Sequence, residues 1–204
     1  MSDKYNKQDG LVDADTGLLK NKLGITDTKA LDQAQNQALL ETYRYAAIHY
    51  SDTHPFSVED VCALHRRFLG GFFDWAGTYR TVDISSKDIR WCHAAHIFAE
   101  MKKYNALLQE NTPFSPEWTR QELLEKLAKV HGELVVIHPF RDGNGRTTRL
   151  LCNLLLLQAG RKTLAAQGFY ERREEYFTAI QEVWRNINYA NLVAFLDLLL
   201  EEPV

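Results

Sequence analysis

The chain has 204 residues, of which 45% are hydrophobic and 25% are charged, as expected for one globular domain with a sizeable core. Its net charge of −3 argues against nucleic acid as the main partner. No apolar run is long enough to span a membrane, and the polar start MSDKYNKQDG carries no sign of a secretory signal. The 3 cysteines are scattered, so we expect a cytoplasmic protein, although a protein exported by a dedicated secretion system could look the same.

The first third of the chain predicts a flexible segment followed by helices. We expect residues 1–17 to form a flexible segment and residues 18–202 to form a single domain. Asp27 or Thr28 is suited to cap a long helix that runs to about residue 50. Ser57 is a favoured cap for a second helix to about Leu69, which Gly70-Gly71 would end. The tripeptide His54-Pro55-Phe56 before this helix has no glycines after it, so we expect a structural role for it.

Residues 78–91 are the one hairpin candidate in the chain. Residues 78–84 alternate between β-forming and polar side chains, residues 85–88 have turn character, and residues 89–91 could return as a second strand. Taken alone, the pattern fits a surface hairpin without a function as well as it fits a functional one. A helix from about residue 92 to residue 110 follows.

The remainder of the chain predicts helices around one polar loop. Thr119 and Glu122 form a capping box for a helix that continues to Ile137. A second helix, at residues 146–158, is apolar nearly all round, which is typical of a helix buried in the middle of a domain. Further helices are expected at residues 171–185 and 189–201. The fold class is therefore all-α with a small β-hairpin.

The loop between the two central helices, with its flanks, reads HPFRDGNGRTTR at residues 138–149. Asn144 is a favoured N-cap, and Gly143 can take a backbone conformation closed to other residues and lets a ligand approach the main chain. The first N–H groups of a helix have no internal partner and lie at the positive end of the helix dipole. Such a loop is a natural cradle for phosphate.

Charged and titratable residues surround this cradle. Arg146 and Arg149 are three positions apart, so both can lie on one helix face and bind a ligand with more than one phosphate. Asp142 is suited to hold Mg²⁺ beside a polyphosphate. His138 has an ordinary pKa near neutrality, so it could deprotonate a hydroxyl that attacks phosphorus. Each residue alone has a common structural explanation, and the prediction depends on finding all of them in one helix–loop–helix.

These residues resemble the signature of the Fic family, HPFx[DE]GNGRxxR, with every fixed position met. The resemblance extends from about Leu19 to about residue 200. It implies a Fic-type helical bundle, with a central helix–anion loop–helix and a hairpin flap that holds a target segment by main-chain pairing. It also implies an adenylyltransferase that moves AMP from ATP to a Ser, Thr or Tyr hydroxyl of a target protein, with Mg²⁺.

The resemblance also assigns roles to single residues. It implies that His138 is the general base and Asp142 the Mg²⁺ ligand. It places the nucleotide on the motif residues Gly143, Asn144, Gly145, Arg146, Thr147 and Arg149. Lys87 and Asp88 at the hairpin tip could also meet the nucleotide, and Tyr176 is similar to a family position near the adenine, although a tyrosine at the edge of the core fits equally well.

Other functions of the same site stay open. The relative called Doc has lysine where this chain has Gly145 and transfers phosphoryl groups, so Gly145 favours AMP transfer. The alternatives are an enzyme that uses another nucleotide or a phosphocholine donor, and a module that binds a nucleotide without turnover.

The sequence can also be compared with a regulatory pattern of the family. Many Fic proteins are inhibited by a helix with the pattern [ST]xxxE[GN], whose glutamate pairs with the second arginine of the signature. Here only Thr178 to Glu182 matches the first five places, and Val183 breaks the last. We therefore expect a small antitoxin protein that acts in trans.

Overall fold

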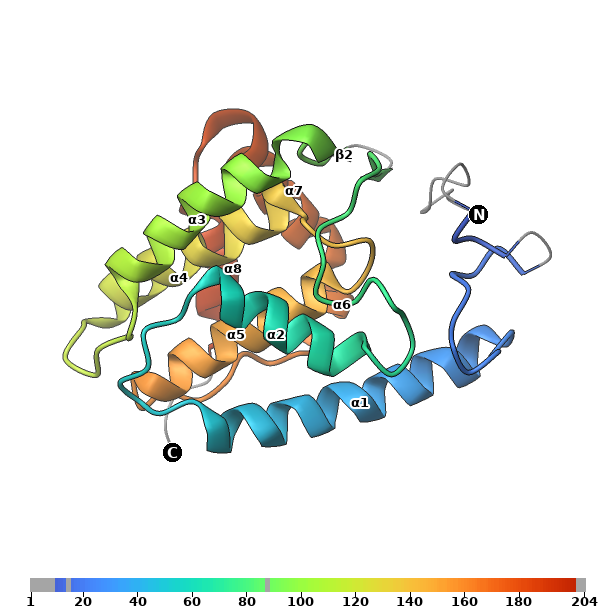
Figure 1. Ribbon diagram of the computed structural model, residues 1–204. Helices are drawn as coiled ribbons and strands as arrows, with labels where there is room; N and C mark the ends of the chain where they lie inside the picture. Colours follow the sequence, from blue (N-terminus) through green and yellow to red (C-terminus); the bar gives the residue numbers. More distant parts are fainter. Residues whose placement is uncertain (1–9, 14–15, 87–88, 201–204) are drawn as a thin grey trace.

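Helices make up nearly all the regular structure of the part that the computed structural model describes, residues 10–13, 16–86 and 89–200 (Figure 1). In chain order the elements are α1 (Thr28–His49), α2 (Val58–Leu69), β1 (Ser85–Ser86), β2 (Ile89–Arg90), the 3-10 helix η2 (Ala94–His96), α3 (Ile97–Asn111), α4 (Arg120–Ile137), α5 (Asn144–Gln158), α6 (Gly168–Glu171), α7 (Arg173–Asn186) and α8 (Ala190–Leu199). The predicted all-α fold with a small hairpin is confirmed.

Helix α4 is the centre of the domain and packs against α3, α5, α7 and α8. It begins at the predicted capping box: the Thr119 side chain accepts from the Glu122 N–H, and the Glu122 carboxylate accepts from the Thr119 N–H. Ten of its residues are buried, spread around the helix: Leu123, Leu124, Leu127, Ala128, Val130, His131, Gly132, Leu134, Val135 and Ile137. A helix covered on most of its surface is held rigidly, so its C-terminal end is a fixed point for the loop that follows.

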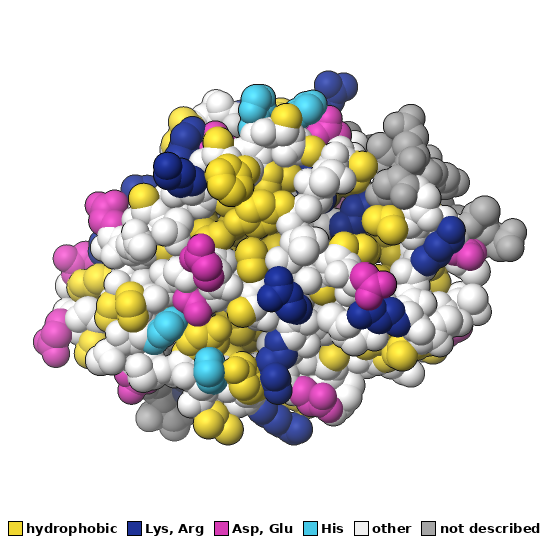
Figure 2. Space-filling model, viewed as in Figure 1, with side chains coloured by type: hydrophobic (Ala, Val, Ile, Leu, Met, Phe, Trp, Pro, Cys, Tyr) yellow, Lys and Arg dark blue, Asp and Glu magenta, His cyan; other side chains and the backbone are white. Residues whose placement is uncertain are grey.

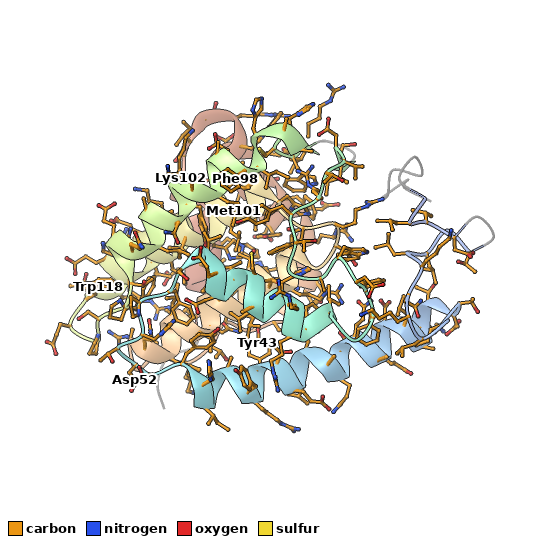
Figure 3. The ribbon with its side chains drawn as sticks, viewed as in Figure 1. Tyr43, Asp52, Phe98, Met101, Lys102 and Trp118 are labelled. Carbon is orange, nitrogen blue, oxygen red and sulfur yellow. The ribbon has the colours of Figure 1, made fainter. Side chains whose placement is uncertain are left out.

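Helix α5 is buried to a similar extent and runs beside α4. The long helix α1 lies along the outside of the bundle, where it packs on α2 and α5 (Figure 1). Figure 3 labels Tyr43 on α1, and its hydroxyl accepts a hydrogen bond from Asn153 Nδ2 of α5 at 3.1 Å. The loop between α4 and α5 is therefore held between two core helices, as predicted.

The hairpin is shorter than predicted and lies further along the chain. Its pairs are Ser85 with Arg90 and Ser86 with Ile89, in antiparallel register. Residues 78–84, predicted as the first strand, have no strand structure, and Ser85-Ser86, predicted as turn, form β1. The physical reason is that this segment bonds to the signature loop, since the Arg80 N–H donates to the Pro139 carbonyl at 2.8 Å. The predicted tip residues Lys87 and Asp88 lie outside the described residues.

The C-terminal helices also begin and end differently from the prediction. The expected helix at about residues 171–185 corresponds to α7, a short helix α6 precedes it, and α8 stops at Leu199. There Leu200 forms an isolated antiparallel bridge with Leu164. A second bridge joins Val12 to Leu19 near the start of the chain.

The described surface mixes both signs of charge. On the face seen in Figure 2, Lys and Arg side chains alternate with Asp and Glu over much of the area. Among the described helices, none combines the length and apolar character that crossing a bilayer requires.

Candidate active site

The loop after α4 turns back into α5 at Gly143, which has the left-handed φ of 79°. The backbone therefore favours glycine, and a Cβ at this position would lie 2.6 Å from Leu69 Cδ1, so that side chain would have to shift. Gly143 is also the N-cap of α5, and the prediction that Asn144 caps the helix was wrong. The first bond of the helix runs from Thr147 N to the Gly143 carbonyl at 2.9 Å, which leaves the N–H groups of residues 144–146 without an acceptor inside the helix.

Asn144 closes the loop instead of capping the helix. Its Oδ1 accepts from the Phe140 N–H at 2.8 Å, and its Nδ2 donates to the Phe140 carbonyl at 2.7 Å. Both residues are buried, at 2% and 1% exposure, so no water can replace these bonds. Phe140 therefore anchors the loop in the core.

His65 of α2 supports the same loop from the opposite side. Its Nε2 is 2.9 Å from the Asp142 carbonyl, and its Nδ1 accepts from the Gly77 N–H at 2.8 Å, so Nε2 carries the proton. Burial lowers the pKa of His65 to about 4, which keeps the ring neutral near pH 7. Because the carbonyl and the next N–H of a trans peptide point in opposite directions, holding the Asp142 carbonyl towards α2 turns the Gly143 N–H away from α2.

His138 sits directly at the end of α4, with the left-handed backbone angles φ 52° and ψ 58°. Pro139 disfavours the right-handed α conformation for this residue, and few residues other than glycine adopt the left-handed one. The His138 Nδ1 is 3.0 Å from the Val135 carbonyl, which can only accept. Nδ1 therefore carries the proton in the neutral ring, and Nε2 has the lone pair that a base needs. The ring lies flat against Trp91, with centroids 4.1 Å apart and planes at 11°.

Asp142 and Arg146 form an ion pair at the start of α5. Arg146 Nη2 is 3.3 Å from Asp142 Oδ2, and their side chains are 18% and 13% exposed. Arg146 also donates to Gln35 of α1 at 2.6 Å, and its guanidinium lies over the Phe68 ring. The half-buried carboxylate is thus held beside the N-terminus of α5.

Arg149 lies over the rings of Phe169 and Tyr170 and makes no ion pair within the described part of the chain. It faces a cavity of about 200 Å³ next to the loop. The cavity is lined by Trp91, Val135, His138, Gly145, Arg149, Phe169, Tyr170, Arg173, Tyr176, Phe177 and Ile180. The predicted base, one predicted arginine and the glycine of the predicted cradle therefore meet at one hollow with aromatic walls.

Two predicted site residues are buried deeper than the prediction implied. Tyr176 is 8% exposed and lines the cavity, but its hydroxyl is bonded to His131 Nε2 at 2.9 Å. Burial raises the Tyr176 pKa. Thr147 is fully buried, its hydroxyl has no partner among the described residues, and it is not one of the residues that line the cavity.

Several residues of the site escaped the sequence analysis. His65, Arg80 and Trp91 come from segments far from the signature, and nothing in their local pattern marks them. His131 had a usable signal, because it lies seven residues before His138 and so near the same face of α4. Arg173 and Phe177 share with Tyr176 the face of α7 that lines the cavity.

Comparison with known proteins assigns this helix–loop–helix to a family. The model of the Fic/DOC family matches residues 55–156. The chain belongs to the Fic/DOC family. This Fic chain is 32% identical over 202 residues to the probable protein adenylyltransferase Fic of Salmonella typhimurium, covering 98% of this chain and 92% of that protein. It is 28% identical over 159 residues to the protein adenylyltransferase VbhT of Bartonella schoenbuchensis, covering 77% of this chain and 33% of VbhT.

Solved Fic structures share the fold. The N-terminal Fic domain of Bep8 from Bartonella sp. 1-1C superposes with a TM-score of 0.80 at 20% identity, covering 96% of each chain. BepC from Bartonella tribocorum, solved with bound AMPPNP, superposes with a TM-score of 0.76 at 22% identity, covering 98% of this chain and 100% of BepC.

The Asn144 clamp predicts a local effect of its removal. Asn144→Ala leaves the Phe140 N–H and carbonyl without these partners, which should cost roughly 2–4 kcal/mol of stability. Amide hydrogen exchange of residues 140–146 should then accelerate. Asn153→Ala is the matched control, because Asn153 also makes two bonds, a part-buried one to Tyr43 and a buried one with the Leu164 N–H. Similar exchange in the loop of both variants would contradict the assignment.

The buried His131 predicts a loss of stability in acid. Burial, with a smaller effect from the charge of Arg149, lowers its pKa to about 3. In the unfolded chain this histidine has a pKa of about 6.5, so the unfolded chain binds more protons than the folded chain between roughly pH 6.5 and pH 3. Stability is complete above this window and falls as the pH drops, by up to about 1.4 kcal/mol per pH unit for this residue.

Urea unfolding at pH 7, 6 and 5 measures this dependence. His131→Gln should be less stable than the wild type at pH 7 but should lose less stability towards pH 5. His49→Gln, at an exposed position of α1, serves as the control and should keep the wild-type slope. An unchanged slope in His131→Gln would show that another group causes the acid sensitivity.

Proposed function

We propose that this chain is a protein adenylyltransferase, which transfers AMP from ATP to a Ser, Thr or Tyr hydroxyl of a target protein. The observation that carries the proposal is the meeting of His138, Gly145 and Arg149 at one cavity beside the N-terminus of α5. Two relatives that match nearly the whole chain are named probable protein adenylyltransferases, which supports the same conclusion.

His138 is the base in this proposal. Its Nε2 takes the proton of the target hydroxyl, and the oxygen attacks the α-phosphorus of ATP. A phosphodiester bond to AMP forms, the bond between the α-phosphorus and its bridging oxygen breaks, and pyrophosphate leaves. The Nδ1 contact with the Val135 carbonyl and the stacking on Trp91 hold the ring ready for this transfer. The Nδ1–carbonyl bond also stabilises the imidazolium that the proton transfer produces.

The N-terminus of α5 and two arginines bind the phosphates. Gly143, Asn144 and Gly145 present N–H groups at the positive end of the helix, where an anion is favoured. Arg149 supplies a charge that no carboxylate neutralises within the described residues. Arg146, which is paired with Asp142, supplies a second positive charge. The aromatic walls of the cavity, with Tyr176 and Phe177, suit a flat base.

Asp142 would hold Mg²⁺. No group of three potential metal-binding side chains occurs among the described residues, so a cage made by the protein alone does not fit. A single half-buried carboxylate beside a phosphate cradle does fit, because Mg²⁺ is usually bound by one or two carboxylates, phosphate oxygens and water. The ion would neutralise phosphate charge, and Arg146 would keep the Asp142 carboxylate in place.

Inhibition by a separate antitoxin protein completes the proposal. Arg149 lacks an acidic partner within the described residues, so a glutamate from another chain could neutralise it. Glu182 is a weak candidate for this task, because its carboxylate accepts from Asn186 Nδ2 at 2.8 Å. It also lies about 200° around α7 from Ile180, which lines the cavity. The 3 cysteines are all free, which fits the cytoplasm as the site of action.

Labelled ATP tests the reaction type. The protein is incubated with cell lysate and with ATP labelled at the α or the γ phosphate. Protein label from the α position alone is the expected result. Label from the γ position alone would mean phosphoryl transfer, and label from neither would mean another donor or binding without turnover, so both results overturn the proposal.

His138→Ala should abolish the α label while the protein remains folded, since no other base replaces the imidazole. The chain contains its own matched control. His54 is followed by the same Pro-Phe pair, but its ring is bonded to Asp60. His54→Ala should therefore retain labelling, and persistent labelling in His138→Ala would refute the assignment of the base.

Glu182→Gly tests inhibition within the chain. If inhibition comes from a separate protein, the purified wild type should be active and Glu182→Gly should transfer AMP at the same rate. The measurement is incorporation of α label with the purified protein and a fixed amount of lysate. A latent wild type that Glu182→Gly activates would replace the antitoxin hypothesis with an internal inhibitor.

A further inference from the structure

Arg80 is a buried charge at a junction of three segments. It is 5% exposed, and its side chain donates only to backbone carbonyls. Nε donates to His138 at 2.8 Å, Nη1 to Val82 at 2.7 Å and Nη2 to Cys92 at 2.5 Å. Its own N–H donates to the Pro139 carbonyl at 2.8 Å. Arg80 therefore holds two successive backbone carbonyls of the signature, those of His138 and Pro139.

The other two carbonyls belong to the base of the hairpin. Val82 precedes β1, and Cys92 follows β2. Trp91, the residue before Cys92, stacks on the His138 ring. In Figure 1 the segment that carries Arg80 leaves α2 and rises along the side of the bundle to the hairpin. Arg80 thus contacts His138 directly through the His138 carbonyl, and indirectly through Cys92, the residue next to Trp91.

The backbone of His138 needs such support. Its left-handed conformation is uncommon for a residue with a side chain, and such conformations persist only where the surroundings hold them. The direction of the His138 carbonyl sets the ψ angle of this residue, and the bond from Arg80 Nε holds that direction. The ring position follows from this angle together with the Val135 and Trp91 contacts.

We propose that Arg80 is a positioning residue for the transfer reaction, which locks the hairpin and the imidazole of His138 in one fixed relation. The inference rests on the proposed function, because it assigns the base to His138. The planar fork of arginine is required, since three donor nitrogens pointing in different directions reach three separate carbonyls. Lysine keeps the charge but has a single nitrogen, so Arg80→Lys removes the fork alone.

The experiment compares the wild type, Arg80→Lys and Arg120→Lys. Arg120 is the matched control, because it donates to the Asp197 and Leu200 carbonyls and to the Asp197 carboxylate. It begins α4, whereas His138 follows the end of this 18-residue helix, roughly 27 Å away. For each protein we measure unfolding in urea, ATP affinity by calorimetry, kcat and KM for AMP transfer, and amide exchange of residues 82–96.

Arg80→Lys should lower kcat on the order of 100-fold, since moving a catalytic group by about 1 Å has an effect of this size. Its affinity for ATP should be unchanged, because Arg80 does not line the cavity. Exchange of residues 82–96 should accelerate in Arg80→Lys only. An equal loss of kcat in both variants, or a loss confined to ATP affinity, would overturn the inference.

Failure of the proposed function is distinguishable from failure of this inference. If the wild type transfers no AMP, the reaction is wrong, and the exchange measurement still tests the link between Arg80 and the hairpin. Unchanged exchange of residues 82–96 in Arg80→Lys overturns the inference whatever the wild type transfers.

Discussion

The site depends on the turn between α4 and α5, and the turn depends on two hydrogen bonds between Asn144 and Phe140. Both helices are buried on most of their surfaces, so they cannot adjust to a loop of another shape. Gly143 supplies the left-handed bend, and His65 fixes the Asp142 carbonyl on the side of α2. The polar groups of the loop that face the core are hydrogen-bonded within the protein. The N–H groups at the start of α5 are then left to bind an anion. Rigidity here is therefore a condition for binding.

The charges around the turn are arranged unequally. Arg146 is compensated by Asp142, whereas Arg149 has aromatic rings around it and no acidic partner within the described residues. A cation in such surroundings is poorly solvated and gains most from an incoming anion. The polar groups behind the cavity do not compete, because burial and the charge of Arg149 both keep His131 neutral. The attraction for a phosphate group is thus built into the fold before any ligand binds.

The sequence alone predicted the parts that depend on local pattern. The helix spans, the capping box at Thr119 and the helix–loop–helix could be found because apolar spacing and caps are local signals. The cap of α5 was misplaced, since Asn144 has both a capping preference and, in this fold, a buried partner four residues earlier. The hairpin was misplaced because Arg80 bonds to the signature loop, a contact between residues 58 positions apart. His65 and Trp91 act through contacts of the same long-range kind.

The repeated tripeptide shows where the specificity of the site comes from. His54-Pro55-Phe56 and His138-Pro139-Phe140 have the same side chains in the same order. His54 is bonded to Asp60, whose carboxylate also accepts from the Ser57 N–H, so it is part of the start of a helix. His138 instead has its Nδ1 at the Val135 carbonyl, a tryptophan on its ring face and Arg80 at its own carbonyl. Identical residues therefore acquire different chemistry because their surroundings differ: the His54 ring is paired with a carboxylate, whereas the His138 ring has a backbone carbonyl at Nδ1 and Trp91 on its face.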